Sequence, residues 1–179
     1  MIHPLKRLVV GVLLLGILLA GVAFALPQQI TVARSTTINA PEPDVFKYVN
    51  SFKRFNEWSP WAARDPETKY VFSGTEQGEG AKMEWSSTNP DVGEGSQEII
   101  ESRTNSYVEV ALDFGQMGKA VASYQLLPSG AGTRIVWAFN TDVGNNPLQR
   151  WMGLMFDRWI GKDYEEGLER LKQLVEKAP

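Results

Sequence analysis

Six short segments of alternating apolar and polar residues follow one another between positions 69 and 141, separated by turn-forming residues. They read KYVFSG, AKMEWSS, GSQEIIESR, SYVEVALDF, KAVASYQLL and TRIVWAFNT. Alternation with a period of two predicts strands that have one apolar face. The link Thr104-Asn105-Ser106 is short enough for a tight hairpin, and short links between consecutive strands favour antiparallel neighbours. The pattern therefore predicts an antiparallel meander of six strands.

Further elements precede this meander. Residues 28–39 predict a first strand, with Ile30, Val32 and Ile38 on one side. A helix start follows at residues 40–44, where prolines and acids precede apolar residues at helical spacing. A second short helical piece is predicted from about Phe52 to Trp58, with Pro60 as its stop. The sheet thus gains a seventh strand, and two short helices follow it.

A long helix is predicted at the C-terminal end, from residues 145–147 to about Lys177. Its second half keeps Leu168, Leu171 and Val175 in register on one face, as an amphipathic helix packed on a sheet does. Its first half is apolar around most of its circumference, which is more apolar surface than one sheet face would cover.

The N-terminal residues indicate a membrane-directed segment. Residues 8–26 carry no charge and follow Lys6 and Arg7. As a helix they would span roughly 28 Å, enough for a bilayer core. Because the basic residues stay on the cytoplasmic side, the chain after Pro27 is expected outside the cytoplasm. A single-pass anchor in the cell membrane is one reading. A signal segment cleaved after Ala25, leaving a periplasmic or secreted domain, is the other.

Composition narrows the chemistry of the single domain expected at residues 28–179. The chain has no cysteine, and its one histidine, His3, precedes the apolar run. This excludes disulfides, a Ser-His-Asp triad and multi-histidine or cysteine metal sites from the domain. No cofactor is expected. The net charge of −3 and the scattered basic residues argue against a nucleic-acid partner.

The order of elements resembles the helix-grip fold of the START-like, Bet v 1-like superfamily, an α+β fold. Within it, several motifs are similar to the bacterial polyketide cyclase/dehydrase and lipid-transport group. They are Ile38-Asn39-Ala40-Pro41, Val45-Phe46 with Tyr48-Val49, Trp58-Ser59-Pro60-Trp61, Asp65-Pro66, Asp163-Tyr164-Glu165-Glu166-Gly167-Leu168 and Leu171-Lys172. The resemblance implies a seven-stranded curved sheet that grips the long helix, with an apolar cavity between them.

Strand parity predicts a lining for such a cavity. One face of the strands is apolar and is expected to oppose Trp151, Met155 and Trp159, which recur every four residues in the last helix. Trp58 and Trp61 flank Pro60, where they would cover the cavity mouth, pack as a lid or enter the membrane interface. The full predicted set is Trp58, Trp61, Met83, Trp85, Val110, Leu112, Phe114, Ile135, Trp137, Phe139, Trp151, Met155 and Trp159.

The sequence is compatible with three functions. The first is a membrane-tethered carrier or sensor of a lipid-like or other hydrophobic small molecule. The second is a cyclase, dehydratase or hydrolase-like enzyme, which needs a carboxylate facing the cavity. This enzyme is disfavoured because the strand alternation directs Glu84, Glu109, Asp113 and Asp142 to the solvent-facing side of the sheet. Glu98 is a further candidate carboxylate. Tyr107 or Tyr124 could serve as a phenolic donor. The third is an envelope protein-interaction domain, which predicts a large exposed apolar patch.

Overall fold

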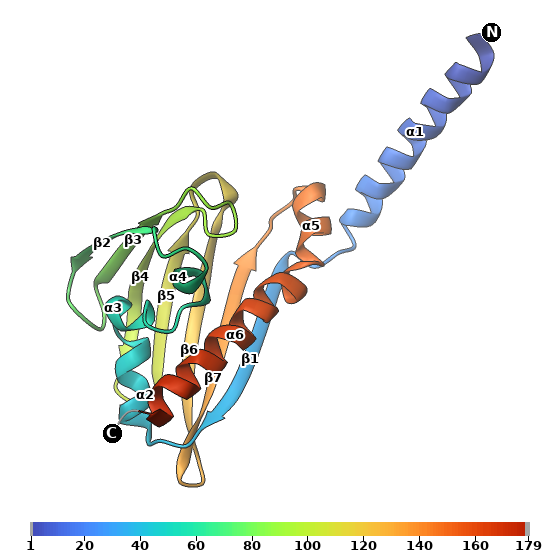
Figure 1. The fold of residues 1–179 in the computed structure, drawn as a ribbon. Coiled ribbons are helices and arrows are strands. Elements are labelled where there is room, and N and C mark those ends of the chain that lie inside the picture. Colours follow the sequence, from blue (N-terminus) through green and yellow to red (C-terminus); the bar gives the residue numbers. More distant parts are fainter. Residues whose placement is uncertain (1, 178–179) are drawn as a thin grey trace.

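The structure is a computed structural model that describes residues 2–177, with side chains from Pro4 onward. The described chain forms a seven-stranded sheet in the order β1-β7-β6-β5-β4-β3-β2 (Figure 1). The strands are β1 (Gln29–Ile38), β2 (Lys69–Gly74), β3 (Ala81–Ser86), β4 (Glu94–Arg103), β5 (Tyr107–Asp113), β6 (Lys119–Ser129) and β7 (Gly132–Asp142). The helices are α1 (Ile2–Ala23), α2 (Glu42–Val49), α3 (Phe52–Phe55), α4 (Pro60–Arg64), η1 (Gly115–Met117), α5 (Pro147–Gly153) and α6 (Phe156–Lys177).

Every neighbouring pair of strands in this sheet is antiparallel, as the short links predict. The predicted hairpin at residues 104–106 turns through Asn105, whose φ of 58° lies in the left-handed region that asparagine tolerates. β1 pairs with β7 along its whole length, from Gln29 opposite Asp142 to Ile38 opposite Thr133. The first strand therefore lies beside the last one, and β1 and β2 form the two edges of the sheet.

The inner face of the sheet holds α6, which crosses it diagonally (Figure 1). In β7, Ile135, Trp137 and Phe139 are buried on this face, while the residues between them face outward. The C-terminal half of α6 buries Leu168 and Leu171 against the sheet. This is the helix-grip arrangement that the sequence predicts.

The short helices differ from the prediction at Pro60. We expected Pro60 to stop the second short helix, but α3 already ends at Phe55 and Pro60 begins a third helix, α4. Proline suits a first helical position, because its missing N–H would have no partner there. The Ser59 hydroxyl caps the new helix by accepting a hydrogen bond from the amide of Ala62 at 3.3 Å.

The long C-terminal helix is also interrupted, whereas the sequence predicted one continuous helix. α5 ends at Gly153 and α6 begins at Phe156. The predicted start is correct, because the Asn146 side chain accepts hydrogen bonds from the amides of Leu148 and Gln149. The break lets α5 turn away from the axis of α6 toward the end of α1 (Figure 1).

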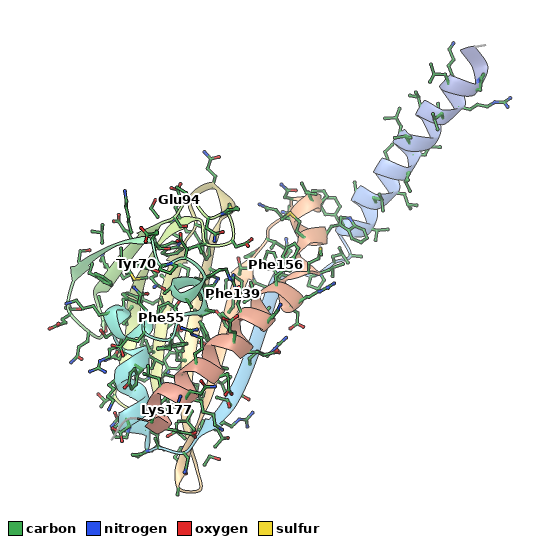
Figure 2. All side chains as sticks on the ribbon, in the orientation of Figure 1. Phe55, Tyr70, Glu94, Phe139, Phe156 and Lys177 are labelled. Carbon is green, nitrogen blue, oxygen red and sulfur yellow. The ribbon has the colours of Figure 1, made fainter. Side chains whose placement is uncertain are left out.

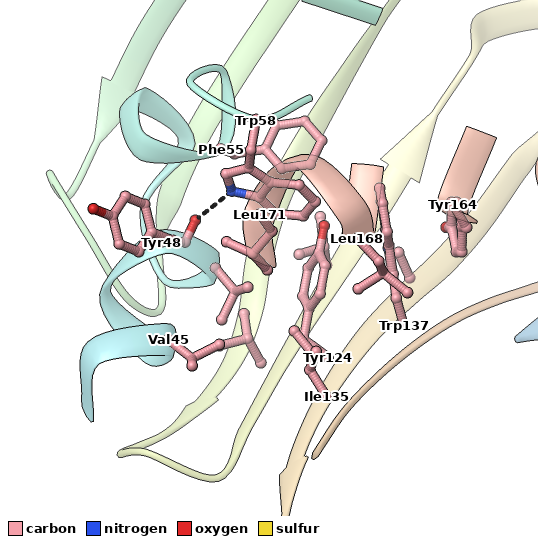
Figure 3. Packing of buried hydrophobic residues seen from close by; sticks show 14 of the residues in the cluster. Val45, Tyr48, Phe55, Trp58, Tyr124, Ile135, Trp137, Tyr164, Leu168 and Leu171 are labelled. Carbon is pink, nitrogen blue, oxygen red and sulfur yellow. Dashed lines mark hydrogen bonds between the residues drawn. The ribbon is translucent and has the colours of Figure 1, made fainter. Parts of the chain in front are cut away.

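The tightest part of the core lies at the end of the domain that is remote from α5. Figure 3 shows Val45 of α2 and Leu171 of α6 in one cluster with Trp58, Tyr124 and Ile135. These five side chains are at most 4% exposed. Burial of a large apolar side chain contributes about 1.5–3 kcal/mol. This end therefore anchors the fold.

The helix α1 projects away from the sheet (Figure 1). Its segment Pro4–Ala23 is long and apolar enough to cross a membrane, and the side chains of residues 4–19 are all exposed. A membrane anchor and a signal sequence share these properties. The predicted apolar run continued to Leu26, but the helix ends at Ala23 and the chain turns toward β1.

Candidate ligand-binding cavity

A cavity of about 710 Å³ lies between the inner face of the sheet and the helices α3 to α6. Its volume falls in the range of small-molecule sites, which is about 300–1,000 Å³. Figure 2 labels Phe55, Tyr70, Phe139 and Phe156, which line it from four different elements. The apolar and aromatic part of the lining is Phe55, Trp61, Tyr70, Met83, Trp85, Val92, Leu112, Phe114, Met117, Ala120, Ala122, Tyr124, Trp137, Phe139, Val143, Leu148, Met152, Phe156, Trp159, Ile160 and Tyr164.

The structure brings together eight of the thirteen side chains that the sequence suggested for the lining. They are Trp61, Met83, Trp85, Leu112, Phe114, Trp137, Phe139 and Trp159. Val110 and Ile135 share the parity of this set but lie deeper in the core, at 2% and 0% exposure. The alternation of residues along a strand predicts which face of the sheet a side chain lies on. The cavity covers only one end of that face, so residues further along it lie in the core.

Trp58 lies in the core rather than at the cavity. It is fully buried, and its indole Nε1 donates a hydrogen bond to the backbone oxygen of Tyr48 at 3.2 Å (Figure 3). Its ring meets Phe55 edge to face at 4.9 Å and Trp137 at 5.2 Å. Trp61, three residues later in α4, does line the cavity. The two indoles of the WSPW motif therefore have different roles.

Trp151 and Met155 also lie away from the cavity. The indole Nε1 of Trp151 donates to the backbone oxygen of Leu19 in α1 at 3.2 Å. Met155 is an exposed residue between α5 and α6. The predicted stripe of three residues assumed one continuous helix. The break at residues 154–155 turns Trp151 toward α1 and leaves only Trp159 at the cavity.

Stacked aromatic rings form one wall of the cavity. The rings of Trp137 and Tyr164 lie 3.7 Å apart and nearly parallel, at 10°. Tyr124 stacks on Trp137 at 5.4 Å. Such a wall is rigid, because each ring fixes its neighbour. Gly167 makes the packing possible, since a Cβ there would come within 2.8 Å of the Trp137 ring.

Few polar groups reach the cavity. Asn56 and Gln97 line it, and both amides point toward the sulfur of Met83, at 3.5 and 4.0 Å. Burial raises the pKa of Tyr124 and of Tyr164 well above the ordinary tyrosine value, so both phenols stay neutral at physiological pH. Apart from the charged residues Lys119, Asp142 and Asp163, the lining thus offers neutral hydrogen-bonding groups within a mainly apolar surface.

Two carboxylates lie on the lining among the described residues. Asp163 is held by Arg64, with Nη2 to Oδ1 at 2.6 Å, and this pair joins α4 to α6. Asp142, which parity placed on the wet face, reaches the edge of the lining at the end of β7 and remains exposed. It accepts hydrogen bonds from Gln29 and from the amide of Gly144. Neither carboxylate sits unpaired in the apolar setting that a general acid needs.

The other candidate carboxylates lie outside the lining. Glu84 is exposed, and Glu98 pairs with Lys82 at 3.0 Å. Lys119 pairs with Asp113 at 2.9 Å and holds the pKa of that carboxyl below its usual range. Glu109 accepts a hydrogen bond from the Tyr107 hydroxyl. Within residues 2–177, no group of three acidic or histidine side chains is placed to hold a metal ion.

The cavity opens beside α5, through Trp159, which the sequence assigned to the lining, and through three residues that it did not assign there. Met117, Leu148, Met152 and Trp159 both line the cavity and are exposed, by 73%, 67%, 43% and 46%. They therefore define its mouth. The apolar circumference of residues 148–160 was the sequence signal for this feature. The apolar residues of this segment that do not pack on the sheet surround the opening of the cavity.

The sheet, the gripped helix and the internal cavity define a protein of the START-like, Bet v 1-like class. A family model described as polyketide cyclase / dehydrase and lipid transport matches residues 29–176, and the chain belongs to this family. Membership indicates hydrophobic-ligand binding or a polyketide-cyclase fold. The comparison with curated proteins found no match.

Solved structures share this fold at low sequence identity. The protein MLL2253 from Mesorhizobium loti is 17% identical, with a TM-score of 0.60 over 83% of this chain and 98% of that one. Ara h 8.0201 is 12% identical, with a TM-score of 0.61 over 84% of this chain and 99% of that one. The di-domain ARO/CYC StfQ from the steffimycin biosynthetic pathway is 11% identical, with a TM-score of 0.63 over 84% of this chain and 51% of that one. These likenesses establish the fold.

Proposed function

We propose that this protein is a membrane-tethered carrier or sensor that binds a lipid-like or other hydrophobic small molecule outside the cytoplasm. The observation that carries the proposal is the cavity of about 710 Å³, whose lining is mostly aromatic and aliphatic. Such a lining favours apolar ligands, because burial of their surface supplies the binding free energy. The pairing of Asp163 with Arg64 favours binding over catalysis, because a general acid needs an unpaired carboxyl group in an apolar setting.

A contact at the end of α1 supports an anchor that stays attached. Arg150 of α5 is 4% exposed, and its guanidinium donates to the backbone oxygens of Ala23, Phe24 and Leu26 at 3.3, 2.9 and 3.1 Å. Cleavage after Ala25 would remove the first two acceptors. The Phe24 ring, 5.4 Å from the guanidinium, would be lost as well, so the full set of contacts exists only in the uncleaved chain. With Lys6 and Arg7 on the cytoplasmic side, the domain lies outside the cytoplasm.

Ligand binding can be tested with the full chain in amphipol and the fluorescent fatty acid cis-parinaric acid. The probe accepts energy from tryptophan, so Trp137 and Trp159 report its entry. Ala122 is buried on the lining, while Val121 of the same strand faces outward. We expect Ala122→Phe to weaken probe binding by about tenfold, which is about 1.4 kcal/mol.

The control Val121→Phe should leave the affinity unchanged, because it adds the same ring to the opposite face of β6. Equal affinities for both variants, or no energy transfer in the unmodified protein, would refute the proposal. Mass spectrometry of the solvent extract from the same preparation would identify any ligand carried over from the cell.

A further inference from the structure

Six exposed apolar side chains gather around the cavity mouth and the adjoining junction of α5 and α6. We name this surface the apolar rim; it consists of Met117, Leu148, Met152, Leu154, Met155 and Trp159. Each is at least 43% exposed. Side chains of this size scattered singly need no explanation, but several around one opening mark an interaction surface.

The apolar rim has two parts: Met117 in the loop between β5 and β6, and the other five residues in α5, α6 and the junction between them. The strand register places both parts at one end of the sheet. Gln29 at the start of β1 is opposite Asp142 at the end of β7, which leads into α5. At the same end, Asp113 is opposite Lys119, and these two residues flank the loop that carries Met117. The hydroxyl of Thr141 donates to the backbone oxygen of Lys119 at 2.7 Å and joins the two parts. This is the end at which the chain arrives from α1.

Direct contacts hold α5 against the apolar helix. Arg150 binds the backbone oxygens at the C-terminal end of α1, and its guanidinium lies 5.4 Å from the centre of the Phe24 ring. Trp151 donates to Leu19, which lies within the segment that is apolar enough to span a membrane. Leu19 is four residues before the end of α1, or about 6 Å along its axis. The indole of Trp151 is therefore level with the last turn of the membrane segment.

The link between α1 and β1 is too short to let the domain move away. Only residues 24–28 separate Ala23 from Gln29, which is about 20 Å at full extension. With the contacts of Arg150 and Trp151 in place, the start of β1 and the whole of α5 stay beside the end of the span. Tryptophan is favoured at this depth of a bilayer, where its ring is apolar and its N–H finds a partner.

We propose that the apolar rim docks on the bilayer that α1 crosses, so that the cavity opens onto the lipid surface rather than onto bulk water. Lipid is what covers the apolar rim, because the contacts of Arg150 and Trp151 hold the rim beside the end of the membrane segment. Arg150 and Trp151 fix the orientation of the mouth. A hydrophobic ligand then passes between bilayer and cavity without crossing water. This inference rests on the proposed function for the retained anchor and extends it to the source of the ligand, a bilayer-dissolved lipid.

The chain has no cysteine, so a label on a single introduced cysteine reports only the depth of that residue in the bilayer. Met117→Cys, Met152→Cys and Leu154→Cys are each labelled with an environment-sensitive fluorophore in the full chain. The protein is placed in nanodiscs of phosphatidylcholine and phosphatidylglycerol, with or without nitroxide-labelled phosphatidylcholine. We expect blue-shifted emission and about twofold quenching by the nitroxide lipid at all three positions.

Matched controls lie elsewhere on the domain. Val71→Cys is at the opposite edge of the sheet and is as exposed as Leu154, at 60% against 54%. Leu127→Cys is eight residues along β6 from Lys119, about 26 Å from the proposed surface. Labels at both controls should stay in water, with unshifted emission and no quenching by the lipid.

The outcomes separate this inference from the proposed function. Water-like emission at all three rim positions would overturn the docking inference, even if cis-parinaric acid still binds. Blue-shifted emission without nitroxide quenching would also overturn it, because a protein or a second copy would then cover the rim. Nitroxide quenching without probe binding would support docking and refute the ligand-binding function.

Discussion

The guanidinium of Arg150 donates from Nη1 to the backbone oxygen of Phe24 at 2.9 Å, which joins α5, the helix beside the cavity mouth, to the end of the apolar N-terminal helix. Helix C-termini present unpaired carbonyls and a partial negative charge, and both favour a cation. The same guanidinium binds Gly144 through Nε at 2.9 Å and the Asn145 side chain through Nη2 at 3.0 Å. One side chain therefore connects α1, α5 and the end of β7.

Arg150→Met should lower the free energy of unfolding by about 2–4 kcal/mol, because several charge-assisted hydrogen bonds are lost and buried carbonyls are left unpaired. Arg150→Lys should lower it less, since an ammonium keeps the charge but fewer donors. Thermal unfolding of the full chain followed by circular dichroism measures both. Arg134, which is exposed on β7, provides the control: Arg134→Met should change stability by less than about 0.5 kcal/mol.

Gly167→Ala should destabilise the domain by about 1–3 kcal/mol, because its Cβ would lie 2.8 Å from the Trp137 ring and 3.2 Å from Pro60. Gly161 of the same helix is the comparison. A Cβ there meets the terminal atoms of the Arg34 side chain, which can move aside, and alanine gains up to about 1 kcal/mol of helix propensity. Denaturant unfolding should therefore rank Gly167→Ala well below Gly161→Ala; the reverse order would contradict the rigid aromatic wall.

Trp58 and Trp159 should respond differently to replacement by phenylalanine. Trp58→Phe removes the hydrogen bond to Tyr48 and leaves a void in the core, so we expect a loss of about 1–3 kcal/mol of stability. Trp159→Phe alters a half-exposed ring at the cavity mouth and should change stability by less than about 0.5 kcal/mol. Chemical denaturation and cis-parinaric acid titration of both variants distinguish the core residue from the mouth residue.

Stability should fall at alkaline pH because Tyr124 and Tyr164 are buried. Burial raises the pKa of both phenols above their value in the unfolded chain, which is about 10. Their contribution is therefore fully present below pH of about 10 and is lost as the pH rises toward the folded-state pKa. Tyr164→Phe removes one such group, so stability should fall less steeply above pH of about 10, by up to 1.4 kcal/mol per pH unit.

Melting temperatures of the unmodified chain and of Tyr164→Phe, recorded from neutral to strongly alkaline pH, test this prediction. Phenylalanine keeps a ring against Trp137, so the two proteins should behave alike near neutral pH apart from a constant offset. Parallel curves through the alkaline range would show that Tyr164 does not resist ionisation in the folded state.

The strands were predictable from the sequence because alternation is a local signal that the sheet preserves. In β7, the period of two assigns Ile135, Trp137 and Phe139 to one face, and all three are buried there. The three differ in what they touch, however. An inward-facing residue lines the cavity or packs in the core according to where α6 lies along the strand. The local alternation of residues does not predict that position.

The break between α5 and α6 was missed because only a weak local signal marks it. Proline, the usual breaker, is not at the junction, and Gly153 alone is a weak signal. In the structure, Arg150 and Trp151 just before the break have their partners at the end of α1, more than 120 residues earlier, and no local pattern contains such contacts. The apolar circumference of residues 148–160 indicated an unusual surface, but the contact with α1 decided which side chains face the cavity.

The separation of the tight core at one end of α6 from the cavity at the other has a consequence for exchange kinetics. Of the residues of α5 only Arg150 and Gly153 are buried, so local opening near α5 breaks the hydrogen bonds of Arg150 and few other buried contacts, and its free energy lies below that of global unfolding. Amide protons of α5 should therefore exchange much faster than those around Leu168 and Leu171, which open only with the whole domain. Under the proposed function, a ligand would then be exchanged many times within the lifetime of a single folded core.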